Sequence, residues 1–181
     1  MAGTRRRISR QEILDGSVQI LDSGVYGDLT VDSLARALHM SKSTLYKHFT
    51  SKQDLIVAVV DQACTGTDEA VRAAESVLAQ GNANALETFI GLVADHASRL
   101  PRAVLLQQKR LPGESQNRLE LTAVMLGRNC SEIVRKGVSS GRFAKVDPEL
   151  AASALMAACK EAMIAAARAD DARPTLIRCR T

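Results

Sequence analysis

The sequence predicts an all-α protein, and three observations point to this class. Apolar residues return at steps of three and four along most of the 181-residue chain, which is the spacing of one helix face. The strict alternation of apolar and polar residues that marks a half-buried strand does not recur. Aromatic residues make up only 3% of the chain, so Ala, Leu and Val must form the core, and such side chains suit close-packed helices better than sheets.

The first helix is expected to begin after Ser9. The Ser9 hydroxyl can cap this helix while the Glu12 side chain reaches back to the cap, and Gly24 is a typical left-handed stop. The apolar residues of the helix share one face, which we expect to point inward: Ile13, Leu14, Val18 and Leu21.

Two short helices follow, separated only by His39 and Met40. Thr30 can cap the first of them, and Ser41 can cap the second, which we expect to run to Phe49. The apolar residues of the first short helix are expected to point inward: Leu34, Ala35 and Leu38. A short helix, a tight turn and a second short helix, braced by helices on either side, form a helix-turn-helix arrangement.

A fourth helix is predicted to begin at Ser51, which forms a second capping-box pattern with Asp54, and to continue past Cys64. Turn signals divide the remainder into helices with approximate spans of 84–99, 101–110, 114–140 and 148–169. No low-complexity linker appears, so we expect one continuous fourth helix to join the two halves. The prediction is a three-helix helix-turn-helix domain with a basic N-terminal arm over residues 1–55, and a second helical domain over residues 56–181.

The second short helix carries an outward face suited to a DNA groove. Each residue advances by roughly 100° along a helix, so Leu45 and Phe49 point inward while Ser43 and Lys47 face outward. Ammonium and hydroxyl groups can donate to bases or phosphates, and phosphate contacts are expected at the helix edges and at neighbouring helix starts. Taken singly, each residue also fits a solvated or packing role. The candidate DNA-binding residues are Thr30, Ser41, Lys42, Ser43, Thr44, Tyr46, Lys47, His48 and Lys52.

Two interpretations of the basic N-terminal arm stay open. Arg5, Arg6 and Arg7 can reach a minor groove or phosphates, or they can form a solvated tail. The net charge of +4 permits attraction to a polyanion, but a balance of this size does not by itself indicate a nucleic-acid partner.

From Ile13 to Leu55, both the residue types and the gaps between them resemble the N-terminal pattern of the TetR family of regulators. The matching residues are Ile13-Leu14, Gly24, Thr30-Val31, Leu34-Ala35, Ser41, Thr44-Leu45-Tyr46, His48-Phe49 and Lys52. The resemblance implies phosphate contacts from Thr30, Ser41, Tyr46, His48 and Lys52, and base contacts from Lys42, Ser43 and Thr44. His39 departs from the pattern, because the family usually has Gly there to relieve left-handed strain, so a strained or altered turn is expected.

In the second half, Gly141-Arg142-Phe143 followed by Asp147-Pro148-Glu149-Leu150-Ala151-Ala152 looks like the family's usual connection between its last two long helices. The resemblance implies a homodimer that binds a palindromic operator in double-stranded DNA. Small residues repeat at helical spacing on the last helix and permit close approach of another helix, either in the partner subunit or in the same chain. This candidate dimer stripe is Ala151, Ala154, Leu155, Ala158, Ala162 and Ala165.

The resemblance also implies a ligand-binding function for the second domain, with a small-molecule effector held between its helices. Each candidate pocket residue is otherwise an ordinary core or surface residue. The candidates are Phe89, Val93, His96, Met125 and Cys130.

Several kinds of chemistry are not indicated by the sequence. The four cysteines lie far apart without any C-x-x-C pair, so no metal site and no cofactor is predicted. No catalytic triad, phosphate loop or nucleotide fingerprint appears, and Asp95 and His96 point about 100° apart on a helix, so no enzyme activity is expected. No stretch approaches roughly 18 uninterrupted apolar residues, so we expect a cytoplasmic protein without a membrane partner.

The expected function is a sequence-specific DNA-binding transcriptional regulator, with a repressor released by a small molecule as the form implied by the family. One alternative keeps the DNA-binding domain but makes the thiol of Cys64 or Cys130 a redox sensor. Another alternative is a non-specific, architectural DNA-binding protein.

Overall fold

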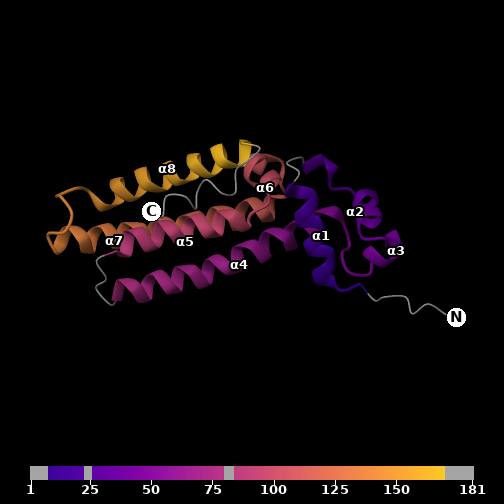
Figure 1. The fold of residues 1–181 in the computed structure, drawn as a ribbon, viewed down its shortest axis with the longest axis horizontal. Helices are drawn as coiled ribbons and strands as arrows, with labels where there is room; N and C mark the ends of the chain where they lie inside the picture. The colour runs from indigo at the N-terminus through magenta and orange to yellow at the C-terminus, as the bar shows by residue number, and fades with distance from the viewer. Residues whose placement is uncertain (1–7, 23–25, 80–83, 170–181) are drawn as a thin grey trace.

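The structure, a computed structural model, describes residues 8–22, 26–79 and 84–169, and within these ranges it contains helices and no strand. Figure 1 shows an elongated molecule in which short helices form one end and long helices lie side by side along the rest. The predicted all-α class is therefore confirmed.

The N-terminal end comprises α1 (Arg10–Asp22), the 3-10 helix η1 (Tyr26–Asp28), α2 (Val31–Ala37), α3 (Lys42–Leu45) and the beginning of α4 (Lys52–Ala79). The remainder comprises α5 (Ala85–Arg99), α6 (Arg102–Leu106), the 3-10 helix η2 (Gln108–Arg110), α7 (Gly113–Ser139) and α8 (Pro148–Arg168). The helix predicted over 101–110 is divided into α6 and η2, because Gln107 leaves the helical region with φ −125 and ψ 33.

The predicted helix starts are confirmed, with one change of partner. The Glu12 amide donates to Ser9 Oγ (3.1 Å), and the Ser9 amide donates back to the Glu12 carboxylate (2.8 Å). At the start of α4, the Asp54 amide donates to Ser51 Oγ (3.0 Å), as expected. The Asp54 carboxylate, however, accepts from the amide of Thr50 (2.8 Å) instead of that of Ser51. Gly24, the predicted stop of the first helix, lies outside the described residues.

A first hydrophobic core holds the helix-turn-helix together and continues into the rest of the molecule. It contains Ile13 and Leu21 from α1, Leu34 from α2, Leu45 and Phe49 from the α3 region, and Ile56 and Val60 from α4. Leu100, Ala103, Val104 and Leu111, which lie in and around α6, belong to the same core. The helix-turn-helix end is therefore joined to the long helices by shared packing and by the unbroken α4.

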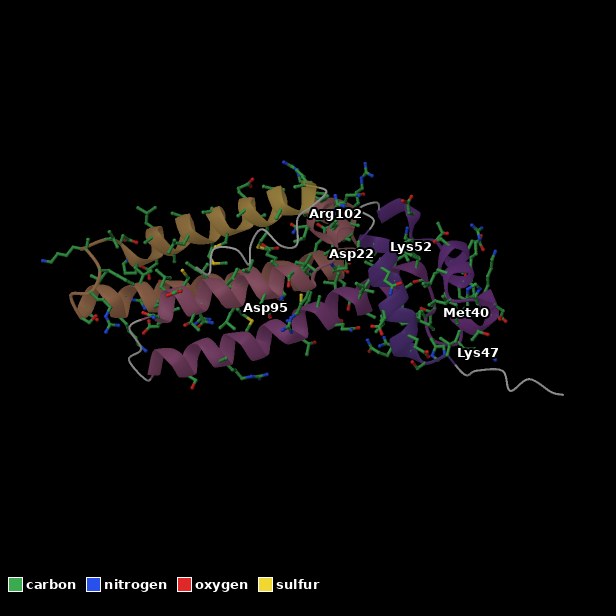
Figure 2. All side chains as sticks on the ribbon, in the orientation of Figure 1. Asp22, Met40, Lys47, Lys52, Asp95 and Arg102 are labelled. Carbon is green, nitrogen blue, oxygen red and sulfur yellow. The ribbon has the colours of Figure 1, made fainter. Side chains whose placement is uncertain are left out.

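Arg102 adds a polar connection at the same junction. Its backbone amide donates to the carboxylate of Asp22 at the end of α1 (3.3 Å), and its side-chain Nε donates to the carbonyl of Ala167 near the end of α8 (2.7 Å). Figure 2 shows Arg102 and Asp22 where the short and long helices meet. One residue of α6 thus contacts the end of α1 and the end of α8.

A second core lies among the long helices, built from Phe89 and Val93 of α5, Leu126, Cys130 and Ile133 of α7, and Ala152 of α8. The connection between α7 and α8 forms as the family resemblance implies. Gly141 has a φ of 71, and the amides of Arg142 and Phe143 donate to the Gly137 carbonyl at 2.9 and 3.0 Å. The chain therefore reverses tightly, so that α8 packs along α7.

α8 is the most apolar long helix and leaves much of its surface open. By length and composition alone, it is the one helix in the described part of the chain that could cross a membrane. Only Ala152 and Ala167 of this helix are buried, and Leu150 is 71% exposed. An exposed apolar helix of this kind requires either a partner or another apolar environment.

Candidate nucleic-acid interface

The turn between α2 and α3 has left-handed geometry at His39. This residue has a φ of 50, and no other non-Gly residue in the described ranges has a positive φ. The turn nevertheless closes, because the amides of His39 and Met40 donate to the carbonyls of Arg36 (3.2 Å) and Ala35 (2.9 Å). Histidine therefore adopts the conformation for which Gly was expected, as the sequence indicated, and it retains the associated strain.

The α-helical part of the second short helix is shorter than predicted, ending at Leu45 instead of Phe49. Beyond it, the Lys47 and His48 amides donate to carbonyls three residues back, those of Thr44 (3.2 Å) and Leu45 (3.0 Å). The chain thus tightens into 3-10-type turns before Phe49, because these bonds reach three residues back instead of four. We use "recognition segment" for residues 41–49.

The side chains of the recognition segment point either inward or outward, as predicted. Leu45 and Phe49 are 2% and 1% exposed and belong to the first core, and Met40 packs against it. Figure 2 shows Lys47 at the end of the molecule formed by α2 and α3. Of the candidates, Thr30, Ser41, Lys42, Ser43, Tyr46 and Lys47 are exposed, while Thr44, His48 and Lys52 are half-buried.

The hydroxyl groups at the start of the recognition segment hold one another in place. Ser41 Oγ lies 2.9 Å from Ser43 Oγ and 2.9 Å from Thr44 Oγ1, and it accepts from the Thr44 amide at 3.2 Å. Nearby, Lys52 begins α4, and partial burial lowers the pKa of its ammonium group. The segment therefore presents a fixed group of hydroxyls flanked by lysine side chains.

Two contacts at this end were not foreseen from the sequence. Lys42 forms an ion pair with Asp32 of α2, and both side chains are largely exposed. The Arg10 guanidinium at the start of α1 lies 4.7 Å from the centre of the Phe49 ring. Both contacts join segments that lie ten or more residues apart in the sequence, so no local spacing indicates them. The arm residues Arg5, Arg6 and Arg7 lie outside the described residues.

The candidate effector residues do not line one cavity. Phe89, Val93 and Cys130 are packed together in the second core, and His96 is buried further along α5. Met125 is 38% exposed and lines a different, open pocket between α7 and α8. Met125 lies apart from the other candidates because Met125 and Cys130 are five residues apart and so point about 140° apart on α7.

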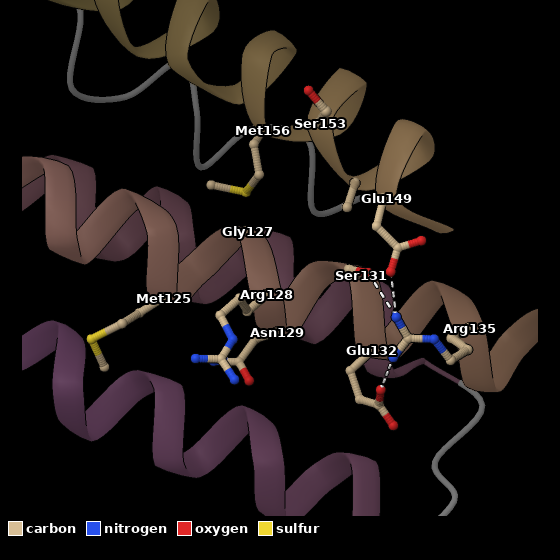
Figure 3. A pocket seen from close by; sticks show the side chains of 11 residues that line it. Met125, Gly127, Arg128, Asn129, Ser131, Glu132, Arg135, Glu149, Ser153 and Met156 are labelled. Carbon is tan, nitrogen blue, oxygen red and sulfur yellow. Dashed lines mark hydrogen bonds and ion pairs between the residues drawn. The ribbon is translucent and has the colours of Figure 1, made fainter. Parts of the chain in front are cut away.

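The open pocket has a volume of about 870 Å³ and is lined by polar and apolar residues of α7 and α8. Figure 3 shows Arg135 between two carboxylates, those of Glu132 on its own helix and Glu149 on α8. The Ser131 hydroxyl also donates to Glu149 (3.1 Å). Hydrogen bonds lower the pKa of the Glu149 carboxyl, and they come first from the backbone, then from the Ser131 hydroxyl and the Arg135 guanidinium. These contacts fasten α8 to α7.

The residues of the candidate dimer stripe lie on two different sides of α8. Ala154, Ala158, Ala162 and Ala165 are exposed, and Ala151 is half-buried. Leu155 packs against the second core of its own chain, which is the intramolecular alternative for this residue. It lies about 100° from Ala154 around the helix, which accounts for the difference.

Within the described ranges, the side chains considered for catalysis or metal binding do not come together in a site. Asp95 pairs with Arg99 one turn along α5 (2.6 Å) instead of with His96. Figure 2 shows Asp95 among the long helices, far from the recognition segment. Within the described residues, no group of three or more His, Cys, Asp or Glu side chains could hold a metal ion.

Comparison with known proteins finds a protein family whose model matches the N-terminal region. The family model "Bacterial regulatory proteins, tetR family" matches residues 13–59. Among characterised proteins, the nucleoid occlusion factor SlmA of Cronobacter sakazakii is 27% identical over 170 residues, covering 87% of this chain and 82% of that protein.

Solved structures extend the similarity to most of the chain. The TetR family transcriptional regulator PfmR from Thermus thermophilus has a TM-score of 0.68 and 26% identity, covering 83% of this chain and 84% of that one. A TetR family regulator from Agrobacterium tumefaciens has a TM-score of 0.68 and 20% identity over 94% and 98% of the two chains. FadR from Bacillus subtilis, in complex with stearoyl-CoA, has a TM-score of 0.63 and 16% identity over 87% and 86%.

Proposed function

Because the chain belongs to the TetR family of DNA-binding transcriptional regulators, we propose that it is a repressor, released from a palindromic operator when a small molecule binds. The observation that carries this proposal is the recognition segment, in which Leu45 and Phe49 anchor an exposed face of hydroxyl and ammonium groups. A face of this composition can donate to base edges and phosphate oxygens.

We assign base contacts to Lys42, Ser43, Thr44 and Lys47, because they belong to the recognition segment and carry short hydroxyls or flexible ammonium groups. The remaining candidates are assigned to phosphates, since they lie at helix starts or at the edge of the segment: Thr30, Ser41, Tyr46, His48 and Lys52. Arg5, Arg6 and Arg7 are assigned to the minor groove or to flanking phosphates. The proposed DNA-binding domain is residues 1–55.

Residues 56–181 form the proposed effector-binding and dimerisation domain. For the dimer interface we propose the exposed small residues of α8, namely Ala154, Ala158, Ala162 and Ala165, with Ala151 beside them. Burial against a second α8 also accounts for the apolar surface of this helix without a membrane. Action on DNA places the protein in the cytoplasm, where members of this family generally occur.

For the effector we propose a site around Phe89, Val93, His96 and Cys130, which lie among the long helices. These side chains are packed, so an effector enters only if the helices separate, and that movement is the proposed signal to the DNA-binding end. The scarcity of aromatic residues favours an aliphatic or small effector over a large planar one.

The experiment that tests the DNA-binding assignment uses Lys47→Ala, which removes an ammonium group, and Tyr46→Phe, which removes one hydroxyl, each from an exposed side chain. Operator affinity is expected to fall about 10-fold or more for Lys47→Ala, in line with roughly 1–3 kcal/mol per base contact. The smaller Tyr46→Phe change should remove one phosphate contact. Fluorescence anisotropy measures both, with circular dichroism and light scattering as controls for folding and dimerisation. Unchanged affinity in both variants would refute the assignment.

The thiol-sensor alternative is disfavoured by the chemistry of the cysteines. Burial, followed by the neighbouring Cys159, raises the pKa of the Cys130 thiol to about 11, and burial also raises the pKa of Cys159. At pH 7 only about one Cys130 in 10⁴ is then a reactive thiolate. Peroxide should leave operator affinity unchanged, whereas a peroxide effect abolished by Cys130→Ser or Cys64→Ser would revive the alternative.

The architectural alternative draws on the similarity to a protein named as a nucleoid occlusion factor. Competition between the selected operator and a scrambled duplex, at one fixed salt concentration, separates the two roles. Affinities within a few-fold of each other would favour the architectural role. We propose no catalytic role, because family members are generally not enzymes.

A further inference from the structure

An acidic side chain stands on the surface that we expect to face DNA phosphates. Asp32 lies in the first turn of α2, two residues after the candidate phosphate contact Thr30. Its carboxylate pairs with the ammonium group of Lys42, the first residue of α3. The two side chains are 58% and 60% exposed, so both remain open to a ligand.

Stability of the fold does not explain this ion pair. Exposed ion pairs contribute about 0–1 kcal/mol to folding, and α2 and α3 are already held by Leu34 and Leu45 in the first core. A carboxylate beside phosphates also repels them unless a cation neutralises it. The position therefore carries an unfavourable charge for general DNA binding, and the pair restricts where the Lys42 ammonium lies.

We propose that Asp32 is a specificity-determining positioning residue that holds Lys42 for a base edge and keeps it from neighbouring phosphates. This inference rests on the proposed function, because it takes Lys42 to be a base contact. A lysine ammonium has three donors, so one bond to Asp32 leaves two for acceptors such as guanine O6 and N7.

An untethered lysine behaves differently. Its long stem lets the ammonium reach phosphates as a point charge on any sequence, which raises affinity without discrimination. The carboxylate of Asp32 offsets that attraction and anchors the ammonium on the α2 side of the recognition segment. Asp32 therefore acts through Lys42, weakening binding to unrelated sequences more than binding to the operator.

The test compares Asp32→Asn with Asp15→Asn as a matched control. Asp15 is exposed on α1, accepts from Gln11 of its own helix (2.8 Å), and its replacement changes the net charge equally. Affinities for an operator selected from random duplexes and for a scrambled duplex are measured across a salt series. Asp32→Asn is expected to bind the scrambled duplex about 10-fold more tightly, and to steepen its salt slope by about 1.8 for two subunits. Asp15→Asn should leave the slope and the specificity ratio unchanged.

A double-variant cycle shows whether the effect passes through Lys42. In the Lys42→Gln background, Asp32→Asn only removes a repulsive carboxylate, so it is expected to raise affinity for both duplexes alike and to leave the specificity ratio unchanged. An equal change of the specificity ratio by Asp32→Asn in both backgrounds would overturn the proposal, since the effect would then not pass through Lys42. So would an unchanged ratio in Asp32→Asn itself. These failures are distinct from failure of the proposed function, which appears as unchanged operator affinity in Lys47→Ala and Tyr46→Phe.

Discussion

At the scale of single residues, His39 carries the strain of the helix-turn-helix. Its φ of 50 lies in the left-handed region, where a Cβ approaches the neighbouring carbonyl and costs about 1–2 kcal/mol. The side chain is exposed, so little packing offsets this cost. The turn is held by its backbone hydrogen bonds and by the half-buried neighbour Met40.

Replacing His39 by Gly should therefore stabilise the protein. The relief of strain exceeds the extra chain entropy that Gly has in the unfolded state, so we expect a gain of about 0.5–1 kcal/mol. Urea unfolding measures the free energy, with His39→Ala as the control, because Ala keeps the Cβ and should give no gain. A less stable His39→Gly protein would contradict the left-handed geometry of the turn.

The predictions for single residues agree with the structure where a side chain bonds or packs according to its position in its own helix. The caps at Ser9, Thr30 and Ser41 follow from hydrogen bonds over three residues, and inward Leu45 and Phe49 follow from helical spacing. The contact between Asp32 and Lys42 could not be foreseen, because the residues lie on different helices and the angle between those helices is set by the core.

At the scale of elements, the reversal between α7 and α8 depends on a close approach at Gly137. This residue is buried in the last part of α7, and a Cβ built on it would overlap the ring of Phe143. The ring lies there because the chain turns back at Gly141 and bonds to the Gly137 carbonyl. The sequence identified this connection only through its family resemblance.

A matched pair of variants in α7 tests this packing. Gly137→Ala should destabilise the protein by about 1–3 kcal/mol, because the added methyl group must displace the Phe143 ring or the turn. Gly127→Ala meets nothing within 4 Å and should stabilise the helix by roughly 0.5–1 kcal/mol. Thermal unfolding of both variants distinguishes them, and equal effects would contradict the close approach.

The turn signals in the sequence predicted the ends of the helices well, with two exceptions. The ends of α5, α7 and α8 lie within one residue of their predicted positions, because Pro, Gly and capping residues mark them. The early end of α3 and the break at Gln107 were missed. Both are changes from four-residue to three-residue hydrogen bonding, which leave apolar spacing almost unchanged over so few residues.

At the scale of the whole molecule, three connections join the DNA-binding end to the long helices. These are the unbroken α4, the first core that includes Val104 of α6, and Arg102, which bonds Asp22 of α1 and Ala167 of α8. The long helices therefore contact α1 through both packing and hydrogen bonds. The sequence predicted the continuous helix, but the shared core and Arg102 join residues far apart in the chain, beyond the reach of local patterns.

The proposed dimer is tested by a charge on α8. Ala158→Glu places a carboxylate on the exposed small-residue stripe, so it should shift the protein toward monomer and weaken operator binding at least 10-fold. Ala73→Glu makes the same change on exposed α4 and should have neither effect. Light scattering is expected to give twice 19.4 kDa for the unmodified protein and for Ala73→Glu. A stable monomer of the unmodified protein would exclude this interface.

The central claim, that the recognition segment reads DNA sequence, is tested most directly by selecting binding sites from random duplexes with the unmodified and Lys47→Ala proteins in parallel. The unmodified protein should enrich one palindromic sequence whose half-sites lie about 10 base pairs apart, or a multiple of that spacing. Lys47→Ala should lose preference at one symmetry-related pair of positions and keep it elsewhere. Enrichment of no sequence by the unmodified protein, or the same motif at the same strength with both proteins, would contradict the claim.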